Sequence, residues 1–375
     1  MMYKRSIEDD IKKHFFQKKV IVLYGPRQVG KTTLVKKLYD EYDGEKVFFQ
    51  CDIPSVRESL FVKSPEELKS YFRSAKLVIL DEAQTVHEIG LMLKIFIDTY
   101  PDVQIIATGS SSFDLANKIR EPLTGRAIEY MLYPLSVEEI VVSDNLLMYK
   151  RKESLYFRYG LYPGILDLSE TEAENRLGTL QNNTFYKDIF TLDNIRKPKV
   201  LQDLIFFLAF NVGSVVTSNN LANELRTTSK TIDRYIDILE KMFVIVRLYG
   251  YSNNKSNEIK KGYKIYFIDV GMRNSIIKSF NKIEERLDTG AIFENYFIIE
   301  RIKYTKYKNI NSNLYFWQGD RGLEVDLIEE RNGRLYAYEC KYKDRKSKGL
   351  KVFSSNYNNS EANIINKDNY LDFVL

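Results

Sequence analysis

A short glycine-containing segment constrains this chain more than any other part of the sequence. Its residues, GPRQVGKT at positions 25–32, have the spacing G-x-x-x-x-G-K-[S/T]. The segment follows the apolar run from Val20 to Tyr24 and precedes Lys31 to Tyr39, in which the apolar residues have helical spacing. A buried strand, a glycine loop and a helix in this order predict a phosphate-binding loop.

The residue types in this loop suit ATP and its Mg²⁺ ion as ligands. Glycines let successive backbone N–H groups turn toward phosphate oxygens, and the helix N-terminus adds a partial positive charge. Lys31 can reach the β- and γ-phosphates, and the hydroxyl of Thr32 can ligate Mg²⁺. We expect these residues to bind the nucleotide: Gly25, Pro26, Arg27, Gln28, Val29, Gly30, Lys31, Thr32 and Thr33.

A second apolar run, Leu77 to Leu80, is followed directly by Asp81 and Glu82. A strand that ends in two acids places the first of them at the carboxyl edge of a parallel sheet, where its carboxylate can hold Mg²⁺. We therefore expect Asp81 to be a magnesium ligand and Glu82 to polarise the attacking water.

A third apolar run, Val103 to Thr108, leads into Gly109 and Ser110. The hydroxyl of Ser110 or Thr108 could hydrogen-bond the γ-phosphate or the water, and a polar strand end at a turn is the alternative interpretation. Strands that alternate with helices over this third of the chain predict an α/β fold with a parallel P-loop sheet covered on both faces.

Several segments together carry a resemblance to a known family. They are GPRQVGKTTL (25–34), LVILDEAQ (77–84), IIATGSSSFDL (105–115), EPLTGRAIEYMLYPLSVEE (121–139), YGLYPG (159–164), YKDI (186–189), GAIFE (290–294) and EVD (324–326). The set resembles the AAA-type ATPase module of a large bacterial and archaeal family whose C-terminal half is a domain of unknown function. The similarity covers nearly the whole chain. Leu161 and Cys340 depart from the family, which usually has glycine and valine there.

The resemblance implies a role for an arginine after the third strand. Arg126 is the candidate for a nucleotide-sensing or finger arginine, and Arg120 is its rival. A guanidinium aimed at the γ-phosphate stabilises transition-state charge, and when a neighbouring subunit supplies it, hydrolysis requires assembly. The resemblance therefore also implies a homo-oligomer. A plain surface arginine is the alternative at each position.

The middle of the chain contains the pattern of a helix-turn-helix. Ser218 to Leu225 and Ser229 to Lys241 each have apolar residues on one face, and a three-residue turn joins them. Met242 to Tyr249 and Tyr263 to Ile268 could be the strands of a wing. Basic and acidic residues are mixed on the exposed side of the second helix, so DNA binding and protein contact both stay open.

A second chemical constellation lies in the last hundred residues. Asp326 is on an expected strand, Asn332-Gly333 predicts a hairpin turn, and the return strand ends in Glu339 and Lys341 on one face. With Glu294 on a preceding helix, the acids and the lysine resemble the PD-(D/E)XK nuclease core, in which the acids bind Mg²⁺ and the lysine assists the attacking water. This resemblance predicts a second Mg²⁺ site here. In the alternative interpretation, the acids only pack or form salt bridges.

The overall charge balance is mild, and only a local cluster indicates a polyanion partner. The chain has 56 Lys and Arg against 51 Asp and Glu, a formal charge of +5. The clustered basic residues are Lys341, Lys343, Arg345, Lys346, Lys348 and Lys351. Because they adjoin the predicted metal site, we expect DNA to be a partner, whereas a solvated face is the alternative.

Two absences in the sequence bear on location. The apolar stretch around Leu204 to Phe210 is far shorter than the roughly 20 residues that cross a bilayer. The two cysteines, Cys51 and Cys340, lack the spacing of a zinc site or a disulfide framework. We therefore expect a cytoplasmic protein without a membrane partner.

The length of 375 residues exceeds one ordinary domain, and the patterns above divide it into four regions. We predict an AAA-type ATPase domain at 1–135, a helical lid or linker at 136–208, a winged-helix-like domain at 209–275 and a restriction-endonuclease-like α/β domain at 276–375. The leading functional prediction is Mg²⁺-dependent ATP hydrolysis coupled to nucleic-acid binding. The alternatives are an ATP-gated, metal-dependent DNA endonuclease and a nucleotide-controlled signalling or scaffold protein without nucleic acid.

Overall fold

The computed structural model describes residues 3–61, 64–109, 122–184, 189, 195–252, 262–343 and 346–375. The chain divides into two compact units. Unit 1 comprises Met1–Leu135 and Lys241–Phe243, and unit 2 comprises Ser136–Glu240 and Val244–Leu375. Within the described ranges, no helix combines the length and the apolar character that a membrane span requires.

Unit 1 is built on a five-stranded sheet with the order β2-β3-β4-β1-β5, and every pair of neighbouring strands is parallel. The strands are β1 (Val20–Tyr24), β2 (Lys46–Gln50), β3 (Leu77–Asp81), β4 (Gln104–Gly109) and β5 (Ala127–Met131). The predicted α/β fold with a parallel sheet is confirmed. The sequence analysis identified β1, β3 and β4, which are buried along their length, but not β2 and β5, which are only partly buried.

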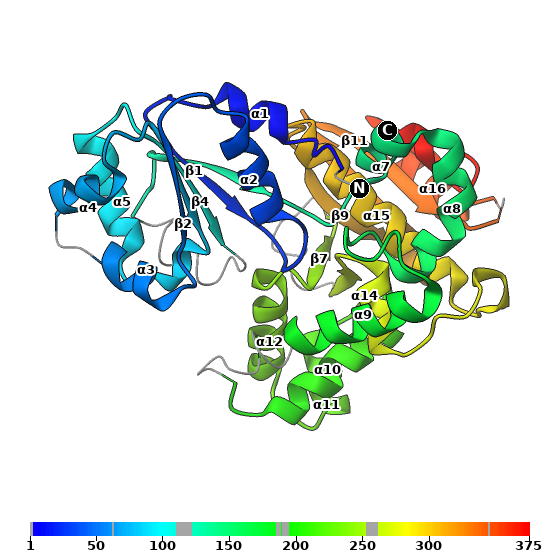
Figure 1. The fold of residues 1–375 in the computed structure, drawn as a ribbon. Helices are drawn as coiled ribbons and strands as arrows, with labels where there is room; N and C mark the ends of the chain where they lie inside the picture. Colours follow the sequence, from blue (N-terminus) through cyan, green and yellow to red (C-terminus); the bar gives the residue numbers. More distant parts are fainter. Residues whose placement is uncertain are drawn as a thin grey trace. The chain divides into compact units, whose positions relative to one another are not determined.

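Helices cover both faces of this sheet, as Figure 1 shows. They are α1 (Glu8–Lys13), α2 (Lys31–Asp40), α3 (Pro54–Leu60), α4 (Pro65–Phe72) and α5 (Ile89–Thr99). Alternate strand residues such as Val78 and Leu80 join one core with Phe72 of α4 and Phe96 of α5. Successive strand residues point to opposite faces of the sheet, and helices cover both faces, so the strands carry apolar residues on both.

Unit 2 is built on a seven-stranded mixed sheet with the order β12-β11-β10-β9-β7-β8-β6. Its strands are β6 (Val215–Val216), β7 (Ile245–Gly250), β8 (Tyr263–Phe267), β9 (Asn313–Gln318), β10 (Glu324–Arg331), β11 (Arg334–Cys340) and β12 (Ser360–Ile365). Its helices are α7 (Val137–Asp144), α8 (Leu146–Tyr159), α9 (Glu170–Asn182), α10 (Pro198–Phe210), α11 (Ser218–Glu224), α12 (Ser229–Lys241), α14 (Val270–Ile276), α15 (Thr289–Tyr307) and α16 (Lys348–Asn356).

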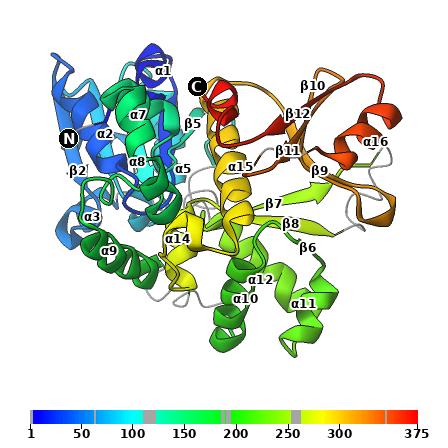
Figure 2. The same ribbon diagram turned by 90° about the vertical axis from the view of Figure 1, so that its right-hand side faces the viewer.

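The helix-turn-helix segment and the C-terminal strands share this sheet. Helices α11 and α12 lie where the sequence places them, beside α10 (Figure 2). The two strands of the expected wing, β7 and β8, pair with each other, and β7 also pairs with β9. The regions predicted as 209–275 and 276–375 therefore share one sheet. The region predicted as 136–208 supplies no strand to it, but its helices α8 and α9 pack on α14 in the same compact unit.

The two long C-terminal helices cover opposite faces of the sheet. On β11, Leu335 and Ala337 join a core with Phe353 of α16. The next residue, Tyr338, points to the other face and packs on Phe297 of α15, with ring centroids 6.0 Å apart. This layering brings the carboxyl end of β11 beside α15, which carries Glu294.

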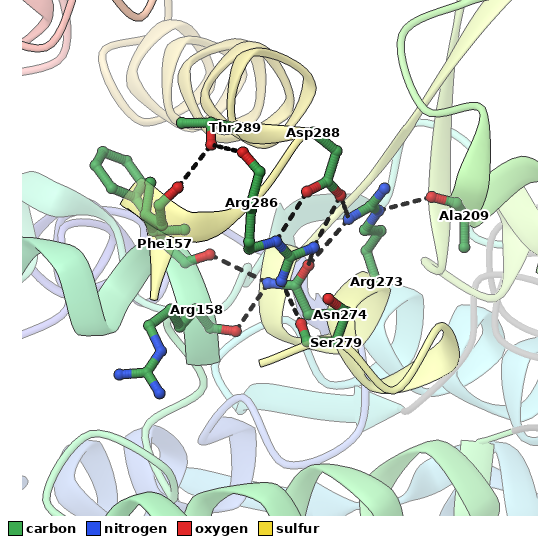
Figure 3. Close-up of polar contacts among 10 residues, drawn as sticks. Phe157, Arg158, Ala209, Arg273, Asn274, Ser279, Arg286, Asp288 and Thr289 are labelled. Carbon is green, nitrogen blue, oxygen red and sulfur yellow. Dashed lines mark hydrogen bonds and ion pairs between the residues drawn. The ribbon is translucent and has the colours of Figure 1, made fainter. Parts of the chain in front are cut away.

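A buried cluster of charged and amide side chains ties four helices of unit 2 together (Figure 3). Arg273 donates to the carbonyl of Ala209 at the end of α10 and to the carboxylate of Asp288, which precedes α15. Arg286 also donates to Asp288, at 2.8 Å from both oxygens. Asn274 donates to two carbonyls at the end of α8. The junction of α8, α10, α14 and α15 therefore depends on one carboxylate shared by two guanidinium groups.

Candidate nucleotide site

The glycine-containing segment forms a tight loop between β1 and α2. A Cβ atom at Gly25 would lie 2.1 Å from the carbonyl oxygen of Leu132, so only glycine fits there. Gly30 and Gln28 have left-handed φ angles of 97° and 61°. The helix that begins at Lys31 starts directly after Gly30, so its free N–H groups lie in the loop.

The substitution Gly25→Ala is expected to damage this loop. The added methyl group must displace backbone rather than a flexible side chain, so we expect a loss of about 2–4 kcal/mol of unfolding free energy and at least about tenfold weaker ATP binding. Thermal unfolding and titration with a fluorescent ATP analogue measure both effects. Gly178→Ala is the matched control, because a Cβ there meets nothing within 4 Å. Normal ATP affinity in Gly25→Ala would contradict the tight-loop description.

Three polar side chains meet beside the loop, at the carboxyl ends of the strands. The hydroxyl of Thr32 donates to one oxygen of Asp81 at 2.9 Å, and the hydroxyl of Thr108 donates to the other at 2.5 Å. Lys31 is buried and donates to the carbonyls of Gly25 and Pro26 at 2.9 and 2.8 Å. The structure therefore places the expected magnesium ligands in direct contact, next to the expected phosphate-binding lysine.

Glu82 adopts a left-handed backbone conformation, with φ at 54°. Its N–H donates to the hydroxyl of Thr108 at 3.0 Å, which fixes the turn after β3. Its carboxylate accepts a hydrogen bond from Gln84 at 2.6 Å. A left-handed conformation of a non-glycine residue, held by two side chains, is typical of functional positions.

Arg5, which no sequence pattern predicted, supports the loop. Arg5 is buried, and its guanidinium donates to the carbonyls of Val29 at 2.6 Å and Tyr133 at 2.7 Å. It thus connects the phosphate loop to the segment after β5. No sequence pattern singles out Arg5, because its partners are backbone atoms 24 and 128 residues away.

Of the two predicted arginines, Arg126 lies away from the phosphate loop. Arg126 precedes β5, whose first residue, Ala127, pairs with Val20 at the start of β1. The loop follows the other end of β1, roughly 15 Å away at about 3.3 Å per residue. Arg126 therefore cannot contact a nucleotide in its own loop, and it pairs with Asp98 at 2.6 Å on a partly exposed surface. Ser110 and Arg120 lie outside the described residues.

Comparison with known proteins agrees with this geometry. Residues 17–141 match the family model "AAA domain". The N-terminal unit is an AAA-type P-loop domain. Residues 151–283 and 289–371 match two models of domains of unknown function, DUF8612 and DUF4143. The predicted resemblance, an AAA-type P-loop protein with a C-terminal domain of unknown function, is confirmed.

Two sequence relatives and one solved structure are reported for the extent of the similarity. An uncharacterised protein of Methanocaldococcus jannaschii is 26% identical over 328 residues, covering 74% of this chain and 67% of its own. Another from the same organism is 25% identical over 405 residues, covering 99% of this chain and 90% of its own. The structure of AMPPCP-bound DnaA from Aquifex aeolicus is 15% identical, covers 64% of this chain and 89% of its own, and has a TM-score of 0.32.

The C-terminal acids of the AAA-type protein meet around a lysine that the sequence analysis did not select. Lys264 of β8 is fully buried, and its ammonium group lies 3.0 Å from Asp326 and 3.2 Å from Glu294. It also forms an ion pair with Glu324. The expected lysine, Lys341, instead pairs with Glu339 of its own strand at 2.6 Å. We call Lys264, Glu294, Glu324 and Asp326 the Lys264 cluster.

Asp326 lies in an irregular part of its strand. The pairing of β10 with β9 shifts register between Val325 and Ile328, so an extra residue is accommodated there. The second oxygen of Asp326 accepts the backbone N–H of Cys340 at 2.9 Å. The hairpin partner β11 thus holds the Asp326 carboxylate that contacts Lys264.

The ionisation of the Lys264 cluster follows from burial and proximity. Burial alone would lower the pKa of Lys264, but the surrounding carboxylates raise it well above its usual value, so the side chain stays charged. Burial raises the pKa of Glu294, and repulsion from Asp326 adds to this shift. Burial and Asp326 likewise raise the pKa of Glu339.

The side chains at the two expected metal sites suit Mg²⁺ at the first site but not at the second. A threonine hydroxyl and a carboxylate are hard oxygen donors, so Thr32 and Asp81 suit Mg²⁺. The Lys264 cluster does not suit a second Mg²⁺, because an ammonium group already lies among its carboxylates. In the ranges that the structure describes, no group of three or more His, Cys, Asp or Glu side chains is arranged to hold a metal ion.

Proposed function

We propose that this AAA-type protein binds ATP with Mg²⁺ at the phosphate loop, hydrolyses it, and couples hydrolysis to nucleic-acid binding. The observation that carries the proposal is the direct contact of Thr32 with Asp81 beside the loop that ends in Lys31. Those two side chains come from different elements 49 residues apart, and both of the expected magnesium ligands are in reach of one ion.

Each residue has a role in this proposal. Loop N–H groups and the ammonium of Lys31 bind the phosphates and balance the charge that grows on them during transfer. Thr32 and Asp81 would hold Mg²⁺, which when bound neutralises phosphate charge. Thr108 orients Asp81 through a 2.5 Å hydrogen bond. Glu82, held by Gln84, accepts the proton of the attacking water.

The substitution Glu82→Gln separates binding from hydrolysis. The amide keeps the size of the side chain but cannot accept a proton, so we expect turnover to fall about 100-fold or more while ATP affinity changes less than about threefold. Phosphate release and equilibrium titration with the ATP analogue measure the two effects. Glu41→Gln, an exposed acid at the end of α2, is the matched control and should hydrolyse normally. Equal turnover in Glu82→Gln and wild type would remove Glu82 from the mechanism.

The arrangement of α12 supports a nucleic-acid partner. The acidic residues of α12 bind partners within unit 2. Asp237 and Glu240 pair with Arg247 at 2.8 and 2.6 Å, and Asp233 accepts a hydrogen bond from Ser218. Lys230, at the start of the same helix, is exposed. The negative charge of this helix is therefore partly compensated within the fold, which lowers its repulsion of phosphates.

Basic residues near the C-terminal cavity support the same partner. A cavity of about 570 Å³ opens beside Glu294 and is lined in part by Lys341, Tyr342 and Lys343. Of the predicted basic cluster, Lys346, Lys348 and Lys351 are also exposed, whereas Arg345 lies outside the described residues. Such a surface suits a phosphate backbone more than an acidic peptide, since the cavity also offers an aromatic ring for base stacking.

Phosphate release in the presence and absence of DNA tests the coupling. We expect duplex or single-stranded DNA to raise the ATPase rate, and the effect to weaken as salt increases, because phosphate contacts release counterions. A charge-reversed variant, Lys343→Glu with Lys346→Glu, should lose the stimulation and keep the basal rate. Turnover that ignores DNA at every salt concentration would instead favour the signalling or scaffold alternative.

Assembly is part of the proposal. Because Arg126 lies at the end of the sheet away from its own loop, it can complete a nucleotide site only on a second subunit. We infer a homo-oligomer in which Arg126 leaves its exposed pair with Asp98 to contact the neighbour's γ-phosphate. The endonuclease alternative is not favoured, because the acids it requires surround Lys264.

A further inference from the structure

We propose that the ammonium group of Lys264 takes the place of a divalent cation in the C-terminal acid cluster, which therefore holds no metal and cleaves no phosphodiester bond. The inference concerns unit 2 alone and does not rest on ATP hydrolysis in unit 1. It assigns to Lys264 a role that none of the sequence patterns indicated.

The N–H donors of Lys264 match the carboxylates around it in number. An ammonium group has three N–H donors, and Lys264 contacts three carboxylates: Glu294, Glu324 and Asp326. A second donor from the same strand, the hydroxyl of Tyr266, binds Glu294 at 2.7 Å. The lysine thus uses its full hydrogen-bonding capacity inside the cluster.

Both oxygens of Asp326 and one oxygen of Glu294 already have protein donors. One oxygen of Asp326 accepts from Lys264 and the other from the N–H of Cys340. One oxygen of Glu294 accepts from both Lys264 and Tyr266. Mg²⁺ requires near-octahedral oxygen ligands at about 2.0–2.1 Å, which these oxygens cannot provide while they bind an ammonium group.

Lys264 cannot easily leave to make room. Its side chain is 1% exposed and lies 5.8 Å from the centre of the Phe316 ring, so both its stem and its head are enclosed. The backbone also closes in near Glu294, since a Cβ at Gly213 would lie 2.7 Å from its carboxylate. If the ammonium group of Lys264 moved out, three carboxylates would lose their counter-charge, which is strongly unfavourable.

Glu339, the remaining acid of the predicted nuclease site, does not complete a metal site. One oxygen of Glu339 pairs with Lys341, and the other has no hydrogen-bond partner among the described residues. A metal would then depend on this oxygen of Glu339 and on the second oxygens of Glu294 and Glu324, because the Asp326 oxygens are in use. Both neighbouring ammonium groups, of Lys264 and Lys341, would repel it.

Mn²⁺ binding without nucleotide, measured from the electron paramagnetic resonance signal of the free ion, tests the proposal. We expect wild type and Asp326→Asn to give the same titration curve, because no bound metal depends on Asp326. Lys264→Met should gain one Mn²⁺ site at least about tenfold tighter than any in wild type, since three carboxylates then face one another. Mn²⁺ should accordingly raise the melting temperature of Lys264→Met but not that of wild type.

Lys303→Met is the matched control, because Lys303 is an equally buried lysine that pairs with Glu300 instead of the cluster. It should lose stability without gaining a Mn²⁺ site. A wild-type Mn²⁺ site that Asp326→Asn removes would overturn the proposal, and this comparison needs no Lys264 variant. A folded Lys264→Met protein that gains no site would overturn it as well.

Discussion

Replacement of Lys31 by alanine is expected to reduce ATP turnover by about 100- to 1000-fold. The ammonium group is buried in the loop and fixed by the carbonyls of Gly25 and Pro26, so it is positioned before any phosphate arrives. Loss of one preorganised cation or donor at developing charge costs about 2.7–4 kcal/mol of transition-state stabilisation. Steady-state phosphate release with Mg²⁺ measures the effect.

Lys36→Ala is the control for this variant, because Lys36 lies on the same helix and is exposed. It should keep the wild-type rate. The unfolding temperature of Lys31→Ala should stay close to that of wild type, which separates lost chemistry from lost folding. Turnover within about threefold of wild type in Lys31→Ala would show that the loop is not the hydrolytic site.

Replacement of Asp288 by asparagine is expected to lower the stability of unit 2 strongly. Asp288 is the shared acceptor of Arg273 and Arg286, both buried (Figure 3). Its removal leaves two buried guanidinium groups without a counter-charge, and Asp288 also precedes the N-terminus of α15. Because the carboxylate is partly exposed, we expect a loss of about 2–3 kcal/mol, or a melting temperature lower by roughly 5–10 °C.

The pH dependence of the stability difference between wild type and Asp288→Asn gives an independent check. Burial alone would raise the pKa of Asp288, but hydrogen bonds from Arg286 and Arg273 lower it to about 2, against 3.8 for an ordinary aspartate. Its stabilisation is therefore full above about pH 5 and is lost as pH falls toward 2. Asp203→Asn is the control, since Asp203 pairs with an exposed lysine on α10 and should cost under about 0.5 kcal/mol. Equal melting temperatures for the two variants would contradict this description.

Local patterns predicted most of unit 1. The phosphate loop, β1, β3 and β4 could be found because their apolar runs are continuous and the loop has a fixed spacing. Strands β2 and β5 lie at the two edges of the sheet and are only partly buried, so their sequences carry a weaker signal.

Unit 2 shows where such reasoning fails. The wing strands were expected to belong to a winged-helix-like domain at 209–275, whereas β7 also pairs with β9, about 65 residues later, in a sheet that includes the C-terminal strands. The acids were found from their spacing on the β10–β11 hairpin, whereas Lys264 comes from a strand on the other side of β9 and β7. Arg5 was missed for a similar reason, because it binds backbone carbonyls that no residue type identifies.

The most direct test of the central claim is phosphate release from ATP by the wild-type protein, measured with Mg²⁺ and with EDTA. We expect many turnovers per subunit with Mg²⁺, almost none with EDTA, and a specific rate that rises with protein concentration as subunits supply Arg126 to one another. ATP that binds tightly with Mg²⁺ but is never cleaved, at any protein concentration and with or without DNA, would contradict it.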